Sequence, residues 1–190
     1  MPLDELRTGA SSSLIITDSN AGVFAGLGNA AVWPGRCAIL TGPARSGKSL
    51  MARYFATQVG CTVIDDADTS GAETLFNAWN RAQENSVPLL LVSRWRPADW
   101  QISLPDLRSR LAAAMLLEIG VPDDELIEQL IQKHLATRGT TITADALGYV
   151  KRRVERSHVA IEGFARAANA LALAENAPIN LALVKQVLGV

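Results

Sequence analysis

The chain has 190 residues, a mass of 20.3 kDa and a formal net charge of −1 at pH 7. With 48% hydrophobic and 19% charged residues, it has enough apolar material for a buried core, which excludes a mainly disordered protein. A net charge so close to zero argues against a protein that binds polyanions over its whole surface, although it leaves room for a local basic face.

The chain lacks the sequence features of secretion or membrane insertion. Its first ten residues contain no apolar segment of the kind found in signal peptides. The longest apolar run, residues 87–92, is far shorter than the ~20 residues of a membrane-spanning helix. Cys37 and Cys61 both lie in apolar runs, and we interpret them as buried, reduced thiols. These features predict a cytoplasmic protein without membrane contact.

The first part of the chain is predicted to hold a short tail followed by an α/β domain. Residues 1–13 are polar and end in three serines, which is typical of a flexible tail. Over residues 14–120, short apolar runs alternate with segments of helical periodicity, and this alternation predicts a parallel sheet with helical crossovers. The expected strands are residues 37–41, 61–64, 88–92 and 115–119, and the expected helices are residues 21–31, 49–59 and 73–85.

After Gly120 the pattern becomes helical throughout, and residues 121–190 are predicted to form a small all-α domain. The acidic residues 123–125 suit the positive end of a helix dipole and mark the first start. The later helices are expected to begin after the capping residues Thr143, Ser157 and Asn180. The expected ends are Gly139, Val154, Ala174 and Leu188.

A glycine-rich loop is the most specific motif in the chain. Residues 42–49 match the pattern G-x-x-x-x-G-K-[ST] in full, between a predicted strand and a predicted helix. The glycines let the backbone wrap a phosphate, the lysine reaches the β- and γ-phosphate oxygens, and the final hydroxyl ligates Mg²⁺. The helix N-terminus adds a positive partial charge. We therefore predict that ATP or ADP binds here with Mg²⁺, through Gly42, Pro43, Ala44, Arg45, Ser46, Gly47, Lys48 and Ser49.

Two aspartates follow the second predicted strand. An acidic residue at the end of a buried strand can hold magnesium, and a neighbouring one can polarise the attacking water. We expect Asp65 to ligate Mg²⁺ together with Ser49, and Asp66 to act on the water. Asp68 is interpreted as a turn or helix cap. Because aspartates are common in turns, this prediction depends on the glycine loop upstream.

Three further polar residues, Ser93, Arg108 and Arg110, each allow more than one interpretation. Ser93 ends the third predicted strand, where it can sense the γ-phosphate, orient the attacking water or simply form a turn. Arg108 and Arg110 precede the last predicted strand. They are either solvated surface charges or the source of an arginine finger for a phosphate on a neighbouring subunit.

Tryptophans and a basic run give weaker indications. Trp79 lies on an apolar helix face and is predicted to be in the core. Trp95 and Trp100 flank Arg96 in a turn predicted to be exposed, which makes them candidates for a partner surface. Residues 151–153 form a basic run that is either a solvated face or a patch for a partner or a DNA backbone.

In this order, the motifs resemble the AAA+ family, and within it the initiator DnaA branch and its short Hda-type relatives. Residues 63–66 are similar to the Walker B motif, residues 93–97 to sensor I and residues 178–188 to the closing lid helix. Residues 107–111 resemble the box that carries the arginine finger, which falls on Arg110. The resemblance implies a P-loop NTPase (AAA+) α/β fold with a parallel sheet core and a small all-α C-terminal lid domain.

Several features depart from the family pattern. Lys48 and Asp65 are only 17 positions apart, so we expect the sheet to lack one strand. Val159 stands where the sensor II arginine is expected, and Arg156, one turn earlier, is a possible substitute. The chain ends where a full initiator continues into its helix-turn-helix domain, so we expect no sequence-specific DNA binding. Residues 1–20 contain no convincing copy of the family's Gln-x-x-Leu-Pro-Leu clamp-binding peptide.

The resemblance implies a weak ATPase that regulates chromosomal replication initiation by stimulating ATP hydrolysis on the initiator DnaA, with Arg110 acting in trans. Implied partners are DnaA, the sliding clamp, and homo- or hetero-oligomers formed through AAA+ edges. One alternative is a nucleotide-sensing adaptor or helicase-loader-type binding module without catalysis. A small-molecule P-loop kinase is the remaining alternative, and the helical C-terminal region argues against it.

Overall fold

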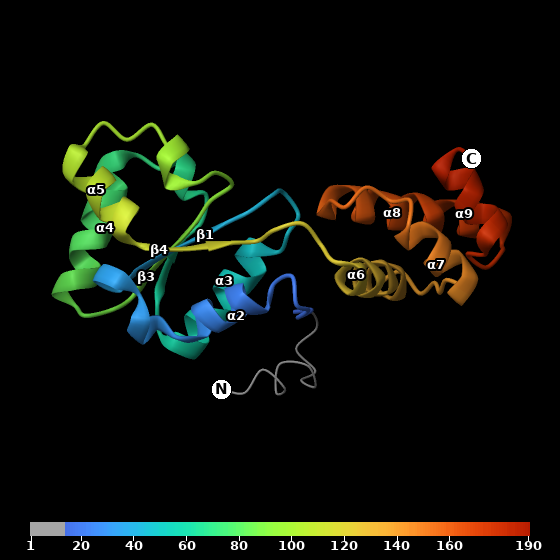
Figure 1. Ribbon diagram of the computed structural model, residues 1–190, viewed down its shortest axis with the longest axis horizontal. Helices are drawn as coiled ribbons and strands as arrows, with labels where there is room; N and C mark the ends of the chain where they lie inside the picture. Colours follow the sequence, from blue (N-terminus) through green and yellow to red (C-terminus); the bar gives the residue numbers. More distant parts are fainter. Residues whose placement is uncertain (1–13) are drawn as a thin grey trace. The chain divides into compact units, whose positions relative to one another are not determined.

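The computed structural model describes residues 14–190, and the predicted tail at residues 1–13 lies outside them. The described chain divides into two compact units. The α/β unit comprises residues 14–16 and 20–120, and the helical unit comprises residues 17–19 and 121–190. In Figure 1 the strands lie in the α/β unit, and residues 121–190 of the helical unit contain helices and no strand.

A parallel sheet of four strands forms the centre of the α/β unit, in the order β2-β3-β1-β4. The interior strands β1 and β3 are buried along their whole length, as their uninterrupted apolar sequences predict. Between the glycine loop and β2 lies only helix α3, which agrees with the short spacing noted in the sequence. The strands are β1 (Cys37–Thr41), β2 (Thr62–Ile64), β3 (Leu89–Val92) and β4 (Met115–Glu118).

Helices cover both faces of this sheet (Figure 1). On one face, α2 (Ala21–Gly28) and α3 (Lys48–Val59) pack against the alternate strand residues Ala38 and Leu40. On the other face, α4 (Ala72–Glu84) and α5 (Pro105–Ala113) pack against Cys37 and Ile39. Successive side chains of a strand point to opposite faces, so β1 contributes to both apolar layers.

Helix α5 was not expected from the sequence pattern. Only Leu107 and Leu111 of its nine residues are buried, and three of the others are charged, so its apolar periodicity is weak. Pro105 stands in its first turn, where the missing N–H costs no intrahelical hydrogen bond. The predicted helix at residues 21–31 is shorter than expected: it ends at Gly28, and short 3-10 turns occupy residues 30–32 and 34–36.

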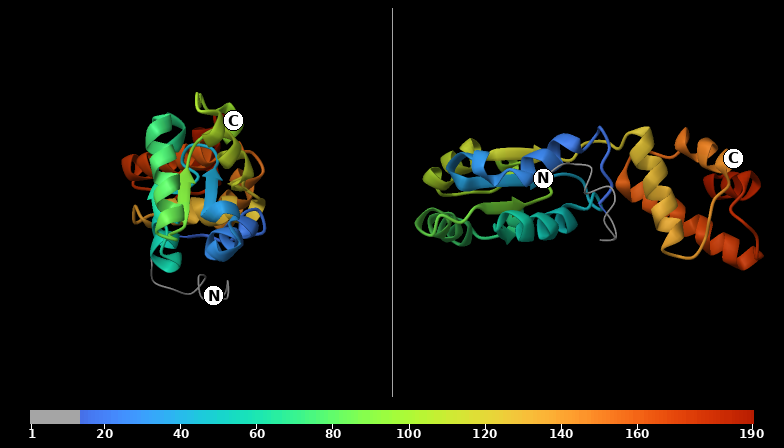
Figure 2. Two further views of the ribbon diagram at one scale, coloured as in Figure 1. Left: turned by 90° about the vertical axis from the view of Figure 1, so that its left-hand side faces the viewer. Right: turned by 90° about the horizontal axis from the view of Figure 1, so that it is seen from below.

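The helical unit contains α6 (Asp124–Ala136), α7 (Ala144–Lys151), α8 (His158–Glu175) and α9 (Leu181–Leu188), seen from a second side in Figure 2. It has an apolar core of its own, in which α8 packs against α6 and α9. None of the helices within residues 14–190 is long and apolar enough to cross a membrane.

Two of the three predicted N-caps in this unit, Ser157 and Asn180, are confirmed by side-chain hydrogen bonds, and Asp123, expected only as part of an acidic first turn, is a further cap. The side chains of Asp123, Ser157 and Asn180 each accept a backbone N–H three residues later, at 2.7, 3.1 and 3.0 Å respectively. Thr143 precedes α7 without such a bond, and α7 ends at Lys151 rather than Val154.

Candidate functional site

The predicted site residues that follow β1, β2 and β3 lie at the carboxyl edge of the sheet. Parallel strands end at the same edge, so the loops that follow β1, β2 and β3 meet there. The Ser93 amide donates to the Leu40 carbonyl oxygen at 3.0 Å, and the Ile119 amide donates to the Thr41 carbonyl oxygen at 2.9 Å. These bonds extend the ladder up to the glycine loop and bring the ends of three strands into register.

The backbone of the glycine loop requires its two glycines. Gly42 has φ +154° and Gly47 has φ +85°, values that L side chains rarely adopt. A Cβ on Gly42 would also lie 2.9 Å from Ile119 Cβ and 3.2 Å from its carbonyl oxygen. Gly47 is the N-cap of α3, so the loop leads directly into a helix N-terminus whose first amides lack intrahelical acceptors.

Lys48 closes the loop on itself. Its Nζ donates to the carbonyl oxygens of Gly42 and Pro43, each at 2.8 Å. Burial lowers the pKa of Lys48, and the negative charge of Asp65 partly opposes that shift. The ammonium group is half-buried at the mouth of the loop. Within residues 14–190 its hydrogen bonds go to carbonyl oxygens, which an incoming anion can replace.

Two buried hydroxyl groups at the loop make no hydrogen bond within residues 14–190. They are Thr41 Oγ1, at the end of β1, and Ser46 Oγ, which lies 3.4 Å from the position of a Cβ on Gly42. A buried hydroxyl without a partner is costly unless a ligand or water satisfies it. Together with Lys48 and the α3 N-terminus, these donors make a cradle that fits a phosphate group.

Asp65 and Asp66 are exposed at the end of β2, on a left-handed turn. Asp66 has φ +52°, which an aspartate tolerates better than most residues, and its amide donates to Asp65 Oδ1 at 3.1 Å. Asp68 Oδ2 accepts the Arg94 amide at 3.2 Å and joins the end of β2 to the end of β3.

Ser93 is buried, and its hydroxyl donates to the Trp95 carbonyl oxygen at 2.8 Å. The Trp100 Nε1 donates to the same oxygen at 2.8 Å. The expectation that Trp100 is exposed is wrong: 8% of it is accessible because its ring packs in the α4–α5 core layer. Trp95 is exposed as expected, with Arg94 Cζ 4.9 Å from its ring centroid.

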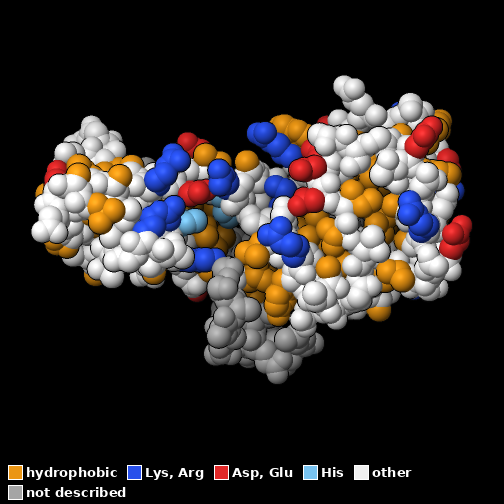
Figure 3. All heavy atoms as spheres, turned by 180° about the vertical axis from the view of Figure 1, so that it is seen from behind, with side chains coloured by type: hydrophobic (Ala, Val, Ile, Leu, Met, Phe, Trp, Pro, Cys, Tyr) orange, Lys and Arg blue, Asp and Glu red, His pale blue; other side chains and the backbone are white. Residues whose placement is uncertain are grey.

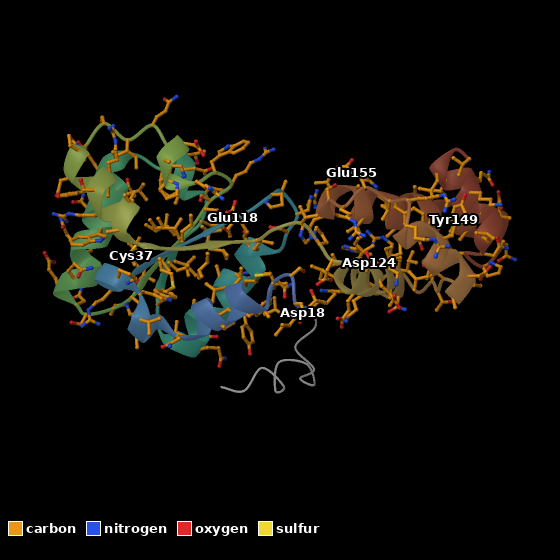
Figure 4. All side chains as sticks on the ribbon, viewed as in Figure 1. Asp18, Cys37, Glu118, Asp124, Tyr149 and Glu155 are labelled. Atoms are coloured by element: carbon orange, nitrogen blue, oxygen red, sulfur yellow. The ribbon has the colours of Figure 1, made fainter. Side chains whose placement is uncertain are left out.

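One pair at this edge was missed from the sequence. Arg96 donates to Glu118 through Nε at 3.2 Å and through Nη2 at 2.5 Å, which raises the pKa of the guanidinium. Figure 4 shows Glu118 at the carboxyl end of β4. In the sequence, the feature that marks Glu118 is an acidic residue at the end of an otherwise apolar strand. The pair fixes the loop after β3 to the fourth strand.

Arg110 lies away from this group. It lies in α5, pairs with Asp106 at 2.5 Å, donates from Nη1 to Asn80 Oδ1 at 3.0 Å, and stacks 4.0 Å from the Trp79 ring centroid. The Trp79 ring in turn lies 3.8 Å from the position of a Cβ on Gly35, just before β1 begins. Arg110 is therefore at the amino edge of the sheet, opposite to the glycine loop.

Arg156 is engaged within the helical unit. Its guanidinium pairs with Asp124, the first residue of α6, and donates to the Pro122 carbonyl oxygen. Asp124 is labelled in Figure 4. Val159 is 54% exposed. In the basic run, Lys151 pairs with Glu128 at 3.0 Å. On the face of each unit in Figure 3, the Lys and Arg side chains are separated by other groups.

No protein-family model matches the sequence, and no curated protein matches it. Solved structures do. Domain III of the Thermotoga maritima replication initiation protein DnaA is 14% identical and matches with a TM-score of 0.75 over 93% of both chains. The Thermotoga maritima RuvB Holliday junction branch migration motor is 16% identical, with a TM-score of 0.65 over 98% of this chain and 70% of that one.

A third match is the replication initiator DnaA bound to AMPPCP and single-stranded DNA, 16% identical, with a TM-score of 0.62 over 86% of this chain and 66% of that one. At such identities the likeness concerns the fold. This chain therefore has the fold of the AAA+ P-loop ATPases and is DnaA-like in its architecture, a parallel four-stranded sheet with flanking helices followed by an all-helical C-terminal portion.

Proposed function

We propose that this chain is a DnaA-related AAA+ protein that binds ATP or ADP with Mg²⁺ and regulates chromosomal replication initiation in the cytoplasm. The glycine loop carries the proposal, because Lys48 and two buried hydroxyls without a partner in residues 14–190 converge on a helix N-terminus. Support also comes from the fold shared with DnaA domain III and with an AMPPCP-bound DnaA.

In the proposed nucleotide complex, Lys48 transfers its hydrogen bonds from the loop carbonyl oxygens to phosphate oxygens. Ser49 and Asp65 are the proposed ligands of Mg²⁺, which supplies neutralisation of phosphate charge when bound. Asp66 is the proposed residue that polarises the attacking water, and Ser93 the proposed γ-phosphate sensor. The phosphates are surrounded by Gly42, Pro43, Ala44, Arg45, Ser46 and Gly47.

Arg110 is the proposed finger for a nucleotide on another subunit. Its place at the amino edge of the sheet, opposite to its own glycine loop, supports action in trans. A guanidinium is permanently charged and planar, so it can stabilise charge that develops on a transferring phosphoryl group. Fingers of this kind contribute roughly 10³–10⁵ in rate. The proposed partner is the initiator DnaA. We propose that the two proteins bind through the edges of their AAA+ domains.

An adaptor without catalysis is the second candidate. It is favoured by the exposed Trp95, 55% accessible, whose carbonyl oxygen is fixed by two hydrogen bonds and whose ring is covered by Arg94. Trp and Arg are common among residues that dominate protein interfaces. Such a protein recruits a partner according to the bound nucleotide and contributes nothing to hydrolysis.

One experiment separates the two functions. The purified protein is added to the ATP-loaded cognate initiator, with and without the sliding clamp on DNA, and phosphate release is followed over time. We expect the initiator to hydrolyse ATP faster in the presence of this protein. Unchanged hydrolysis with the clamp present, together with binding to the initiator, would favour the adaptor.

A further inference from the structure

Four side chains of α4 and α5 surround Arg110. The Arg110 Cζ lies 4.0 Å from the Trp79 ring centroid and 5.0 Å from that of Phe76. Nη1 donates to Asn80 Oδ1 at 3.0 Å, and Nη2 pairs with Asp106 at 2.5 Å. We call Phe76, Trp79, Asn80 and Asp106 the Arg110 frame. It restrains both the plane of the guanidinium, through the rings, and its direction in that plane, through the polar groups.

The frame is a specific feature of this position on α5. Among residues 14–190, Arg108, two residues earlier on the same helix, donates to the backbone carbonyl oxygen of Ile102 and has no comparable set of partners. A surface arginine ordinarily samples many rotamers, and ordering it costs conformational entropy. Aromatic stacking and two polar contacts offset that cost for Arg110, so its guanidinium is already ordered before any partner is bound.

The framed guanidinium keeps the capacity to bind a further anion. A guanidinium has five N–H donors, and the contacts with Asn80 and Asp106 occupy only part of them. The Arg110 side chain is 25% exposed, and that of Asp106 is 60% exposed, so this edge of the frame is open to solvent. A group ordered in this way reaches a phosphate without a new entropic cost at the moment of binding.

We infer that Trp79 is a positioning residue for Arg110, and that it orients the guanidinium toward a phosphate of the partner's nucleotide. Asn80 and Asp106 fix the direction in which the N–H groups point. The inference rests on the proposed function, since it assigns a role to Trp79 in the action of Arg110 on a partner. The frame thus raises the rate of hydrolysis on the partner rather than the affinity for the partner.

The test compares Trp79→Leu with Trp79→Phe in the full chain. Initiator ATP hydrolysis is measured against the concentration of this protein, which gives a maximal stimulated rate and a half-saturating concentration. We expect Trp79→Leu to lower the maximal rate by about tenfold or more, because small misplacements of a catalytic group have effects of that order. The half-saturating concentration should stay within about twofold, since only catalytic geometry changes. Trp79→Phe keeps a ring beneath the guanidinium and should retain most of the rate.

Circular dichroism and nucleotide affinity show whether each variant is folded. Should Trp79→Leu fail to fold, Asp106→Asn is the second variant: it removes the ion pair and keeps the stack, and a lowered maximal rate is expected again. If Trp79→Leu or Asp106→Asn is folded and stimulates as well as the parent, the inference is overturned and the proposed function still stands. A variant that stimulates more strongly than the parent also overturns the inference, because the frame would then hold Arg110 in a geometry that hinders its action on the partner's nucleotide. A parent that does not stimulate at all refutes the proposed function, and the inference with it.

Discussion

The guanidinium of Arg110 lies 4.0 Å from the centre of the Trp79 ring, so the proposed finger is also part of this protein's own packing. Trp79 lies in α4 and Arg110 in α5, and the stack therefore joins the two helices on one face of the sheet. Removing the arginine side chain has two separable consequences, one on a partner's hydrolysis and one on the stability of this protein.

Arg110→Ala should abolish stimulation of the partner's ATP hydrolysis and leave this protein's own nucleotide binding unchanged. It should also lower the free energy of unfolding by about 0.5–2 kcal/mol, the range of a cation–π contact. Hydrolysis assays and chemical denaturation measure the two effects. Arg108→Ala is the matched control, and it should do much less because Arg108 donates to the Ile102 carbonyl oxygen and lies outside the Arg110 frame. Full stimulation by Arg110→Ala would show that the finger is elsewhere.

Lys48→Ala should abolish or greatly weaken the binding of ATP and ADP. In the described part of the chain, Lys48 Nζ hydrogen-bonds the carbonyl oxygens of Gly42 and Pro43, and Lys48 is outside the apolar core, so the variant should remain folded. Calorimetric titration with ADP measures the change. Lys185→Ala, in the helical unit, removes the same charge and should bind as the parent does. Equal affinity in the parent and Lys48→Ala would contradict the proposed site.

The isolated protein should hydrolyse ATP slowly, well below the roughly 1–100 s⁻¹ of kinases. Arg110 is at the opposite edge of the sheet from its own loop, and the family resemblance puts Val159 where a sensor II arginine is expected. Arg156 is already engaged by Asp124. Steady-state phosphate release from dilute protein tests this expectation, and turnover within the kinase range would favour the small-molecule kinase.

Asp123→Ala should destabilise the helical unit by about 1–2 kcal/mol, the cost of losing an N-cap. Asp123 Oδ1 accepts the Leu126 amide at 2.7 Å, and Oδ2 accepts the Ser19 amide at 3.0 Å. Thermal unfolding followed by helical circular dichroism reports the loss. Thr143→Ala is the control, because within residues 14–190 the Thr143 side chain hydrogen-bonds the Asp145 side chain and caps no backbone amide of α7. Equal losses in both variants would show that the Asp123 cap contributes little.

The stability of the helical unit should depend on the ionisation of His134. Burial lowers the pKa of His134 below 6.5, with a further contribution from Arg138, while Glu162 acts in the opposite direction. Because the folded-state pKa is depressed, the unfolded chain binds the proton more readily. Stability is therefore full above pH 6.5 and falls as the pH decreases toward the lowered pKa.

His134→Gln should remove this part of the pH dependence. Denaturant unfolding at pH 7.5 and at pH 5.5 measures it in the parent and in the variant. The other histidine of the chain, His158, is present in both proteins, so the difference between them isolates His134. An identical pH dependence in parent and variant would contradict the prediction.

Local features of the sequence determined the sheet strands, the glycine loop and most helix starts. Apolar runs placed β1 and β3 within one residue of their observed bounds, because strands buried on both faces are mostly apolar, with Thr41 at the end of β1 the exception. Asp123, Ser157 and Asn180 cap helices through amides three residues away, an interaction that depends on adjacent residues alone. The order of the short motifs also predicted the DnaA-like AAA+ fold, through their resemblance to that family.

Only the tertiary structure decided which distant side chains meet. Arg110 and Asn80 are 30 residues apart, Arg94 and Asp68 are 26 apart, and Arg96 and Glu118 are 22 apart. Trp100 is buried for the same reason, since its turn folds back onto α4 and α5. Periodicity reports the face on which a residue lies, but the neighbour opposite that face is set by strand order and helix packing. The Arg110 frame therefore had no signal in the sequence, and for the Arg96 pair the acidic end of β4 marked Glu118 but not its partner.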